Sequence, residues 1–556
     1  MKTAFSLGLL LAFLPLGARA QTGKYTSAGD CDGLPRIEVS TPRGVCVGVV
    51  ADGFRFPRTV TSLADGSLIV VDMGGWVPKR GSLWRLSPDP ATHTYVKRKV
   101  LERLDRPHGA AVGPDGLLYI GELSRVFRFN PDAADPAATV ETVIADLPTE
   151  GRHPLTALVF DKQGYLYVNR GSASDNCETT KAYRPTNGRI CPEAEGHSAR
   201  GVIRRYALTG PNRTATRWSN YAVGLRNSMA LAIHPDSGLF VQGENSRDSI
   251  SRKDRSLDDR TLPHEELNII TPWQDYGWPY CYDDNKASPE FKGFDCSRMR
   301  KPALLLPAHV APLGMAYYSG GMFPDWYKGK LLMTWHGYRD FGQKLVAIPT
   351  DAVGRPVGEP LEIINGWYRK GAQPMGAPVG VSVGKDGSLF LAEDKNGTVL
   401  RVFFDPSKGN GIPTPGLSVN PGKDPDLEAR CQELATRDDS FSRIQRDIID
   451  PLCTSCHGAA GGNAGNLRLA RCDDIGNAQR LLAPRPGRSP FVVPKSLKSE
   501  FYLRLEGTTP GLPPMPAGGL SPEQLEEVAG WINEGAPVPV SRAPGTDTPV
   551  ATDGTP

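Results

Sequence analysis

The chain has 556 residues and is nearly balanced in charge, with 64 lysines and arginines against 61 aspartates and glutamates. That length allows two to four domains with large cores. The charge balance disfavours a protein that binds nucleic acid or an anionic membrane surface, because such proteins carry a marked basic excess.

Residues 1–20 have the pattern of a secretory signal peptide. Lys2 supplies the positive start, residues 7–16 form an apolar run, and Ala18-Arg19-Ala20 matches a cleavage site. The apolar run is too short to span a bilayer stably, and no later segment is long and apolar enough to do so. We therefore expect an exported, periplasmic protein without a membrane span.

Eight of the ten cysteines occur as neighbours along the chain, and an even number at close spacing in an exported protein predicts disulfides. Free buried thiols are the alternative, and spacing alone does not fix the connectivity. The expected pairs are Cys31 with Cys46, Cys177 with Cys191, Cys281 with Cys296, and Cys431 with Cys472.

One pattern recurs six times, consisting of an apolar run, a turn that contains glycine, and a second apolar run. Such repeats, about fifty residues apart, are typical of propeller blades, whereas an ordinary β-sandwich would not explain the recurrence. We therefore predict an all-β six-bladed β-propeller over residues 21–405. The two longest gaps separate the third, fourth and fifth repeats, where long loops usually carry function. The turn glycines are Gly66, Gly116, Gly164, Gly238, Gly329 and Gly387.

Residues 406–425 are rich in glycine and proline and predict a linker. Beyond it, residues 440–452 carry a helical apolar stripe. Ser521 and Pro522 match the start of a second helix, and Gly535 matches its end. We expect a small all-α domain over 426–540 and a disordered tail over 541–556.

The helical segment contains Cys453-Thr454-Ser455-Cys456-His457, and C-x-x-C-H is the attachment signal for haem c. Cys453 and Cys456 would form the thioethers and His457 would ligate the iron. Met515, in a proline-rich loop, is the expected second axial ligand. A zinc half-site or a redox dithiol is the alternative, but no second Cys or His pair lies close by. We therefore predict a cytochrome c domain that passes single electrons.

A group of short motifs in the propeller segment resembles the sugar dehydrogenases that depend on pyrroloquinoline quinone (PQQ), in particular the glucose/sorbosone dehydrogenase family. The resemblance covers about residues 40–404 and implies a propeller with PQQ over its mouth and a bound Ca²⁺. The motifs are Gly224-Leu225-Arg226-Asn227, Glu244-Asn245-Ser246-Arg247-Asp248, His264-Glu265-Glu266-Leu267-Asn268, Tyr276-Gly277-Trp278-Pro279-Tyr280-Cys281, Ala311-Pro312-Leu313-Gly314, Met322-Phe323-Pro324 and Trp335-His336-Gly337-Tyr338-Arg339.

PQQ carries three carboxylates, and arginine forms bidentate bonds to carboxylates. Arg226 and Arg339 are the expected partners, with Asn227 as a neutral donor. A hard cation would polarise a quinone oxygen, and oxygen ligands suit Ca²⁺. By the resemblance, Asn245 and Glu244 are the candidate ligands, while Glu266 is a candidate to brace the same loop.

Oxidation of a hydroxyl also needs a base, and histidine suits that role because it titrates near neutral pH. His153 matches the position of the family's catalytic base, and His108 occupies a similar place one repeat earlier. A purely structural histidine is the alternative for each of them.

The chain departs from the family at two positions where arginines are common, because it has Ala377 at one and Thr156 near the other. Lys344, Arg369 and Lys370 are possible replacements. The sequence predicts oxidation of an aldose or related sugar, with electrons passed from PQQ to haem c and on to a respiratory acceptor. The alternatives are a lactonase-like propeller hydrolase and a cofactor-free binding propeller that keeps an electron-transfer haem.

Overall fold

The computed structural model describes residues 25–89, 94–178, 191–209, 214–337, 341–368, 375–413, 425–457, 467, 469–470, 472–485, 487–509, 515 and 520–540. The predicted signal peptide and C-terminal tail lie outside these residues, as do Arg339, Arg369 and Lys370.

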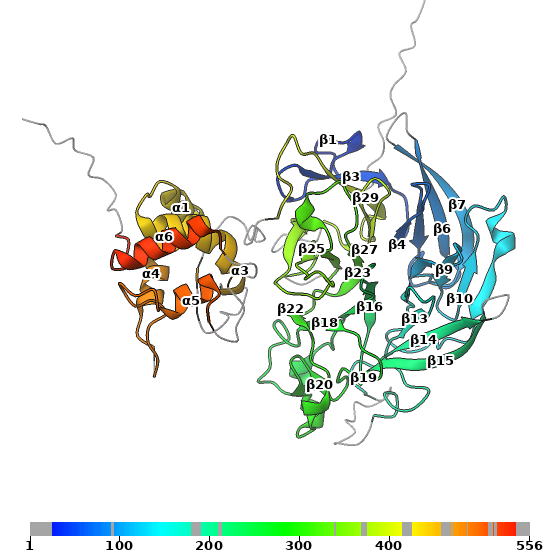
Figure 1. The fold of residues 1–556 in the computed structure, drawn as a ribbon. Helices are drawn as coiled ribbons and strands as arrows, with labels where there is room; N and C mark the ends of the chain where they lie inside the picture. Colours follow the sequence, from blue (N-terminus) through cyan, green and yellow to red (C-terminus); the bar gives the residue numbers. More distant parts are fainter. Residues whose placement is uncertain are drawn as a thin grey trace, which may run out of the picture.

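Six antiparallel sheets of four main strands follow one another along the chain and confirm the six-bladed propeller (Figure 1). Blades one to three are β4 (Pro57–Ser62), β5 (Leu68–Asp72), β6 (Gly81–Asp89) and β7 (Thr94–Leu104); β8 (Ala110–Val112), β9 (Leu118–Gly121), β10 (Val126–Phe129) and β11 (Glu141–Ile144); and β12 (Leu158–Phe160), β13 (Leu166–Arg170), β14 (Val202–Thr209) and β15 (Thr214–Val223), with β19 (Gln274–Asp275) added at the edge.

Blades four to six complete the ring. They are β16 (Ser228–Ile233), β17 (Phe240–Glu244), β18 (Glu265–Ile269) and β22 (Leu304–Leu306); β23 (Pro312–Tyr317), β24 (Leu331–Trp335), β25 (Lys344–Ile348) and β26 (Leu361–Ile364); and β27 (Pro378–Val383), β28 (Leu389–Glu393), β29 (Thr398–Phe404) and β3 (Val45–Ala51).

The six predicted turn glycines all lie between the first and second strands of a blade. Their φ angles range from +72° to +92°, a region that glycine adopts without the steric cost of a Cβ atom. Each sequence repeat therefore corresponds to the first two strands of one blade.

The sixth blade is built from both ends of the propeller segment, because β3 pairs with β29, with Val49 opposite Leu400. The hydroxyls of Ser62 and Ser382, 3.2 Å apart, join blades one and six. The ring is therefore closed by a blade that takes strands from both ends of the propeller segment.

All four predicted disulfides are confirmed, with Cα–Cα distances of 5.0–6.0 Å. Cys177–Cys191 lies in the long β13–β14 connection. Cys281–Cys296 ties β20 (Cys281–Tyr282) to the segment after β21 (Lys286–Ala287). The short helices η3 (Pro289–Phe291) and η4 (Cys296–Arg298) lie in the insertion that carries Cys281–Cys296, and η2 (Ile250–Arg252) lies in the β17–β18 connection; η1 (Pro136–Thr139) and η5 (Asp325–Tyr327) lie in blades two and five.

The Cys31–Cys46 bond should stabilise the ring closure, because it links β3 to the hairpin of β1 (Asp30–Cys31) and β2 (Leu34–Pro35). Replacing both cysteines by serine is expected to lower the free energy of unfolding of the propeller by ~3 kcal/mol, the chain-entropy value for a loop of this length. Denaturant unfolding followed by tryptophan fluorescence measures the loss. An unchanged midpoint would mean that this bond does not stabilise the closure.

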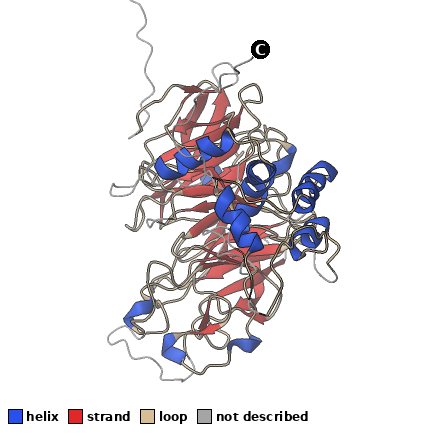
Figure 2. Ribbon diagram, turned by 90° about the vertical axis from the view of Figure 1, so that its left-hand side faces the viewer, coloured by secondary structure: helices blue, strands red, loops and turns tan. Residues whose placement is uncertain are grey.

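The C-terminal part is helical and has its own core, as predicted (Figure 2). The helices are α1 (Pro425–Ala435), α2 (Ser440–Ile444), η6 (Gln445–Cys453, a π-helix), α3 (Thr454–His457), α4 (Asp474–Leu482), α5 (Glu500–Glu506) and α6 (Pro522–Asn533). Ser521 and Gln524 form the capping box that the sequence predicts. None of the helices among the described residues has the length and apolarity needed to cross a bilayer.

The first residues of the predicted linker contact the propeller. The backbone of Gly411 donates to Arg43 O at 2.9 Å and its carbonyl accepts from Tyr327 Oη at 2.8 Å. Residues 406–413 therefore still pack on the propeller, because backbone hydrogen bonds hold this glycine- and proline-rich stretch in place.

Candidate functional site

The innermost strand of each blade begins at the same end of the propeller, and the second strand ends there. We call this end the mouth. A channel of about 360 Å³ runs between the innermost strands, and His108 lines it. The predicted residues His153, Arg226, Asn227, Asn245 and Glu244 all lie at mouth ends of strands or in loops beside them.

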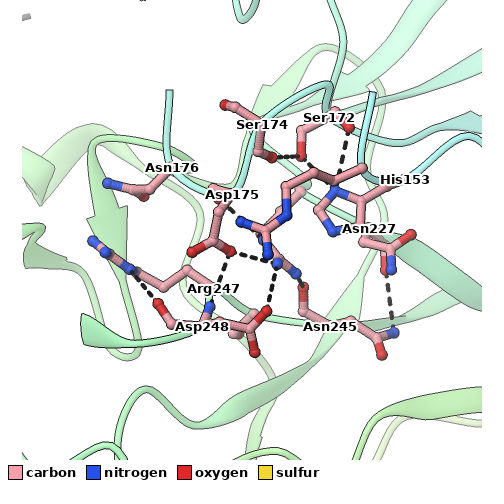
Figure 3. Close-up of polar contacts among 12 residues, drawn as sticks. His153, Ser172, Ser174, Asp175, Asn176, Asn227, Asn245, Arg247 and Asp248 are labelled. Atoms are coloured by element: carbon pink, nitrogen blue, oxygen red, sulfur yellow. Dashed lines mark hydrogen bonds and ion pairs between the residues drawn. The ribbon is translucent and has the colours of Figure 1, made fainter. Parts of the chain in front are cut away.

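His153 is held by the loop that follows β13 (Figure 3). Its Nδ1 lies 2.8 Å from Ser172 Oγ and 3.2 Å from Ser172 O. The Ser172 hydroxyl donates its proton to Ser174 O at 2.6 Å, so its oxygen acts as acceptor toward the imidazole. The proton of a neutral His153 therefore sits on Nδ1, and the lone pair is on Nε2.

The charge state of His153 agrees with this assignment. Burial and, after it, the nearby cations Arg226 and Arg152 together lower the pKa of His153 to about 2. His153 is therefore neutral at physiological pH. Its Nε2 has no hydrogen-bond partner within the part of the chain that the structure describes, so it is available as a proton acceptor.

Arg226 is buried and contacts the loops that carry Asp175, Asn245 and Asp248. It donates to Asp175 Oδ1 at 2.5 Å, to Asn245 O at 2.8 Å and to Asp248 Oδ2 at 3.3 Å. The guanidinium predicted to bind a carboxylate thus already pairs with two carboxylates of the protein. Its contacts also fix the loop that carries Asn245.

Asn227 and Asn245 lie beside each other between blades four and five. The Asn245 amide donates to Asn227 O at 3.2 Å and to Pro312 O at 2.9 Å. Asn227 Oδ1 is buried and has no hydrogen-bond partner among the described residues. An unpaired buried acceptor is costly, and it indicates that Asn227 faces a polar ligand.

Sequence reasoning missed a second cluster, which joins blades one, two, five and six. Arg58 pairs with buried Asp394, and His336 Nε2 lies 3.0 Å from the same carboxylate. Arg58 Nη2 also lies 3.4 Å from His108 Nε2. Arg58 stands near the start of the innermost strand of its blade, close to the place that His108 has in blade two. The sequence repeat could therefore have pointed to Arg58, because Arg58 and His108 have similar positions in their blades.

Electrostatics at this cluster favour a neutral imidazole and a charged carboxylate. Burial lowers the pKa of His108 well below its usual value, as do Arg58 and His336. Burial alone would raise the pKa of Asp394, but the hydrogen bond from His336 and the charge of Arg58 lower it overall. His108 Nδ1 is buried without a partner.

The two positions without arginine are filled by protein contacts. The Ala377 amide donates to Glu393 Oε1 at 2.8 Å, and Thr156 Oγ1 donates to Glu122 O at 3.0 Å. Lys344 is paired with Glu362 at 2.6 Å, so that charge is already compensated. Among the described residues, Arg58 adds a cation at the mouth that the sequence did not suggest.

The Glu244 carboxylate holds the backbone beside Asn245 in place. Its Oε1 accepts from the backbone N–H of Asn227 at 2.7 Å, and its Oε2 accepts from Gln242 Nε2 at 2.7 Å. Glu265 accepts from the Ser246 amide, and Glu266 accepts from Asn268 Nδ2 at 3.2 Å. Among the described residues, the one group of His, Cys, Asp and Glu with metal-ligand spacing is Cys177, Cys191 and Glu193, and its cysteines form a disulfide. Calcium binding through Asn245 and Glu244 stays a prediction.

The buried glutamates should make stability depend on pH. Burial raises the pKa of Glu244 to about 7 and of Glu265 to about 8, from 4.5. The folded state then keeps protons that the unfolded state releases, so this contribution is complete below pH ~4.5 and is lost as pH rises toward 8, by at most ~1.4 kcal/mol per pH unit per glutamate. Glu265→Gln should flatten the slope in denaturant unfolding at pH 5 and pH 8. Glu102→Gln, at an exposed residue, serves as control, and equal slopes for both variants would contradict the assignment.

The structure describes the surroundings of three predicted haem residues in the helical segment. His457 Nδ1 lies 3.2 Å from Leu467 O, a contact that orients the ring and leaves Nε2 for a metal. Cys453 is buried in the helical core. The Met515 amide donates to Arg504 O at 2.8 Å, and its side chain is 37% exposed. Cys456 belongs to α3, but its side chain lies outside the described part.

Comparison with known proteins gives one family match: the TrAA12-like model matches residues 39–403, more than half of the chain. An uncharacterized protein of Borreliella burgdorferi is 28% identical over 191 residues, 33% of this chain and 48% of that relative. Aldose sugar dehydrogenase YliI of Escherichia coli is 23% identical over 313 residues, 52% of this chain and 77% of the relative. The chain thus spans about half the length of the first relative.

Two solved structures share the propeller. The iodide structure of Trichoderma reesei Carbohydrate-Active Enzymes Family AA12 has a TM-score of 0.55 and 21% identity, covering 68% of this chain and 100% of that chain. The holo form of the pyranose dehydrogenase PQQ domain from Coprinopsis cinerea has a TM-score of 0.51 and 20% identity, covering 66% and 98%. At these identities the likeness establishes the fold.

Proposed function

Because the chain belongs to the TrAA12-like family, we propose that it is a quinoprotein that oxidises an aldose or related sugar at the propeller mouth. PQQ is the proposed electron acceptor there, and haem c in the helical segment is the proposed second carrier. A periplasmic respiratory partner would take the electrons onward. The observation that carries the proposal is the neutral His153 with its Nδ1 proton fixed and its Nε2 open.

The residues at the mouth fit an anionic quinone in chemical type. Arg58 and Arg226 provide positive charge for its carboxylates, and Asn227 Oδ1, a buried acceptor without a donor among the described residues, suits the proposed cation. When bound, PQQ supplies a quinone that accepts two electrons as hydride. Arg58, Arg226 and Asn227 would hold it, and Ca²⁺ at the loop of Asn245 would add positive charge.

The protein's own contribution to the reaction is proton transfer. His153 Nε2 accepts the proton of the sugar hydroxyl as hydride leaves the carbon. Ser172 keeps the other ring nitrogen protonated and fixes the ring plane. Arg226 orients the neighbouring loop through Asp175 and Asn245. This division of roles resembles other base-assisted oxidations in which a second group orients the histidine.

One experiment separates this function from its alternatives. The full chain, matured with haem, is mixed with PQQ, Ca²⁺ and a panel of aldoses while haem absorbance is recorded. Reduction that requires both PQQ and sugar supports the proposal. Lactone hydrolysis without haem reduction would favour the hydrolase, and the absence of both, with sugar binding retained, would favour a binding propeller.

A further inference from the structure

A second hollow, distinct from the mouth, lies between blades three and four and has a volume of about 320 Å³. Such a volume suits one or two sugar rings. Part of its lining comes from the first turns of these blades, which stand at the end opposite the mouth. We call it the aromatic groove; its lining residues are Asp161, Gln163, Tyr165, Tyr167, Arg205, Tyr221, Ile233, Gly238 and Phe240.

Arg205 is framed by aromatic rings. Its guanidinium carbon lies 4.7 Å from the ring centre of Tyr165, 5.3 Å from that of Tyr221 and 5.8 Å from that of Trp273. Within the described part of the chain, no hydrogen bond or ion pair engages its side-chain nitrogens. The cation is therefore positioned by ring contacts, while its planar N–H donors stay available to a ligand.

Two further polar side chains of the groove, Asp161 and Gln163, can also bond a ligand. Asp161 accepts from the Tyr165 amide and from Tyr167 Oη, both at 2.9 Å, which fixes the carboxylate in place. Gln163 is exposed beside it. The charges of Asp161 and Arg205 cancel, so the groove suits a neutral ligand better than a nucleic acid or an anionic lipid.

Trp273 supplies an exposed ring beside the groove. Its side chain is 62% exposed, and its ring centre lies 6.1 Å from that of Tyr221. The Trp273 amide donates to Tyr221 O at 2.7 Å, which anchors it to β15. The exposed face of this ring lies next to fixed donors and acceptors, an arrangement that can hold the apolar face of a ligand whose edge is polar.

From this arrangement we propose that the aromatic groove binds a pyranose unit of a neutral oligosaccharide. The apolar C–H face of the ring packs on Trp273 and Tyr165, while its hydroxyls bond Arg205, Asp161 and Gln163. The groove holds the sugar chain without chemistry, because the candidate base His153 belongs to the mouth. It extends the proposed function from a soluble sugar to an anchored saccharide.

The test uses a probe that cannot react at the mouth, namely cellohexaose whose reducing end has been reduced to the alditol. Isothermal titration of the full chain without PQQ gives its Kd. Trp273→Ala is expected to weaken binding about 10-fold or more. Trp76→Ala is the matched control, because Trp76 is 56% exposed but follows β5 at the mouth end. Its Kd should equal that of the parent.

Three outcomes would overturn the proposal: no binding by the parent, equal binding by parent and Trp273→Ala, or weakening by Trp76→Ala instead. The last result would place the saccharide at the mouth. Oxidation of a monosaccharide by PQQ-loaded Trp273→Ala should match the parent, so a failed groove and a failed active site give different results. A second variant, Arg205→Met, removes the donors, keeps the stem and should weaken binding likewise.

Discussion

Replacing His153 by alanine is expected to slow sugar-dependent haem reduction by ~10²-fold or more, the usual contribution of a general base. The cause is the loss of the Nε2 lone pair that accepts the hydroxyl proton. Affinity for PQQ, measured by titration of the full chain, should stay close to that of the parent, since removal of a neutral ring takes away no charge. Stopped-flow absorbance of the haem at saturating sugar and PQQ gives the rate.

The orienting residue provides the sharper control. Ser172→Ala leaves the imidazole in place but removes the Oγ that accepts from Nδ1 at 2.8 Å. We expect a smaller loss in kcat than in His153→Ala, with KM little changed, and recovery in Ser172→Thr, which keeps the hydroxyl. If His153→Ala oxidises sugar at the parental rate, His153 is structural and His108 becomes the candidate base. If PQQ binding fails as well, the substitution has disturbed the site.

The repeat pattern predicted the blades because the turn between the first two strands of each blade needs a residue with positive φ. A glycine at that one position of each blade made the repeat visible in the sequence. Gly66 and Gly387 illustrate it, standing between the first two strands of the first and last blades. The closing strand β3 carried no comparable signal. Its partner, β29, lies about 350 residues away along the chain, and such pairing depends on the finished ring.

The sequence could group residues that sit in one short motif, such as Arg226 and Asn227, but not residues that come together from different blades. The pair of Arg58 with Asp394 joins the first and last blades, so neither residue drew attention in sequence. Conversely, the sequence presented Arg226 as a free cation, although Asp175, in a loop of another blade, already neutralises part of its charge.

These contacts change how the departures Ala377 and Thr156 are interpreted. A site with fewer arginines must still offset the carboxylates of an anionic cofactor. Arg58 adds a cation, but Asp394 shares it. Asp175 and Asp248 likewise share Arg226. Among the described residues, the charges of Arg58 and Arg226 are therefore partly offset, and we expect Ca²⁺ to strengthen PQQ binding.

The largest effect in the helical segment is expected from Met515. If His457 and Met515 ligate the haem iron, Met515→Ala removes the ligand that raises the potential. The midpoint should fall by on the order of 0.1 V, a modest share of the ~0.8 V range that axial ligation spans. The ferric iron should also become open to imidazole or cyanide. Redox titration of the Soret and α bands follows the first change, and ligand titration follows the second.

Two further variants make this assignment testable apart from the sugar site. Met515→His should again block access of imidazole or cyanide to the iron. The reduction potential should stay low, because an imidazole replaces the thioether ligand. Cys453→Ser should lower the amount of haem that stays attached to the chain after denaturation, because one thioether bond is lost. An unchanged potential in Met515→Ala would remove Met515 from the ligand set and leave the second ligand to another residue. A parent chain without covalently held haem would contradict the electron-transfer role itself while leaving the reaction at His153 to be tested with an external acceptor.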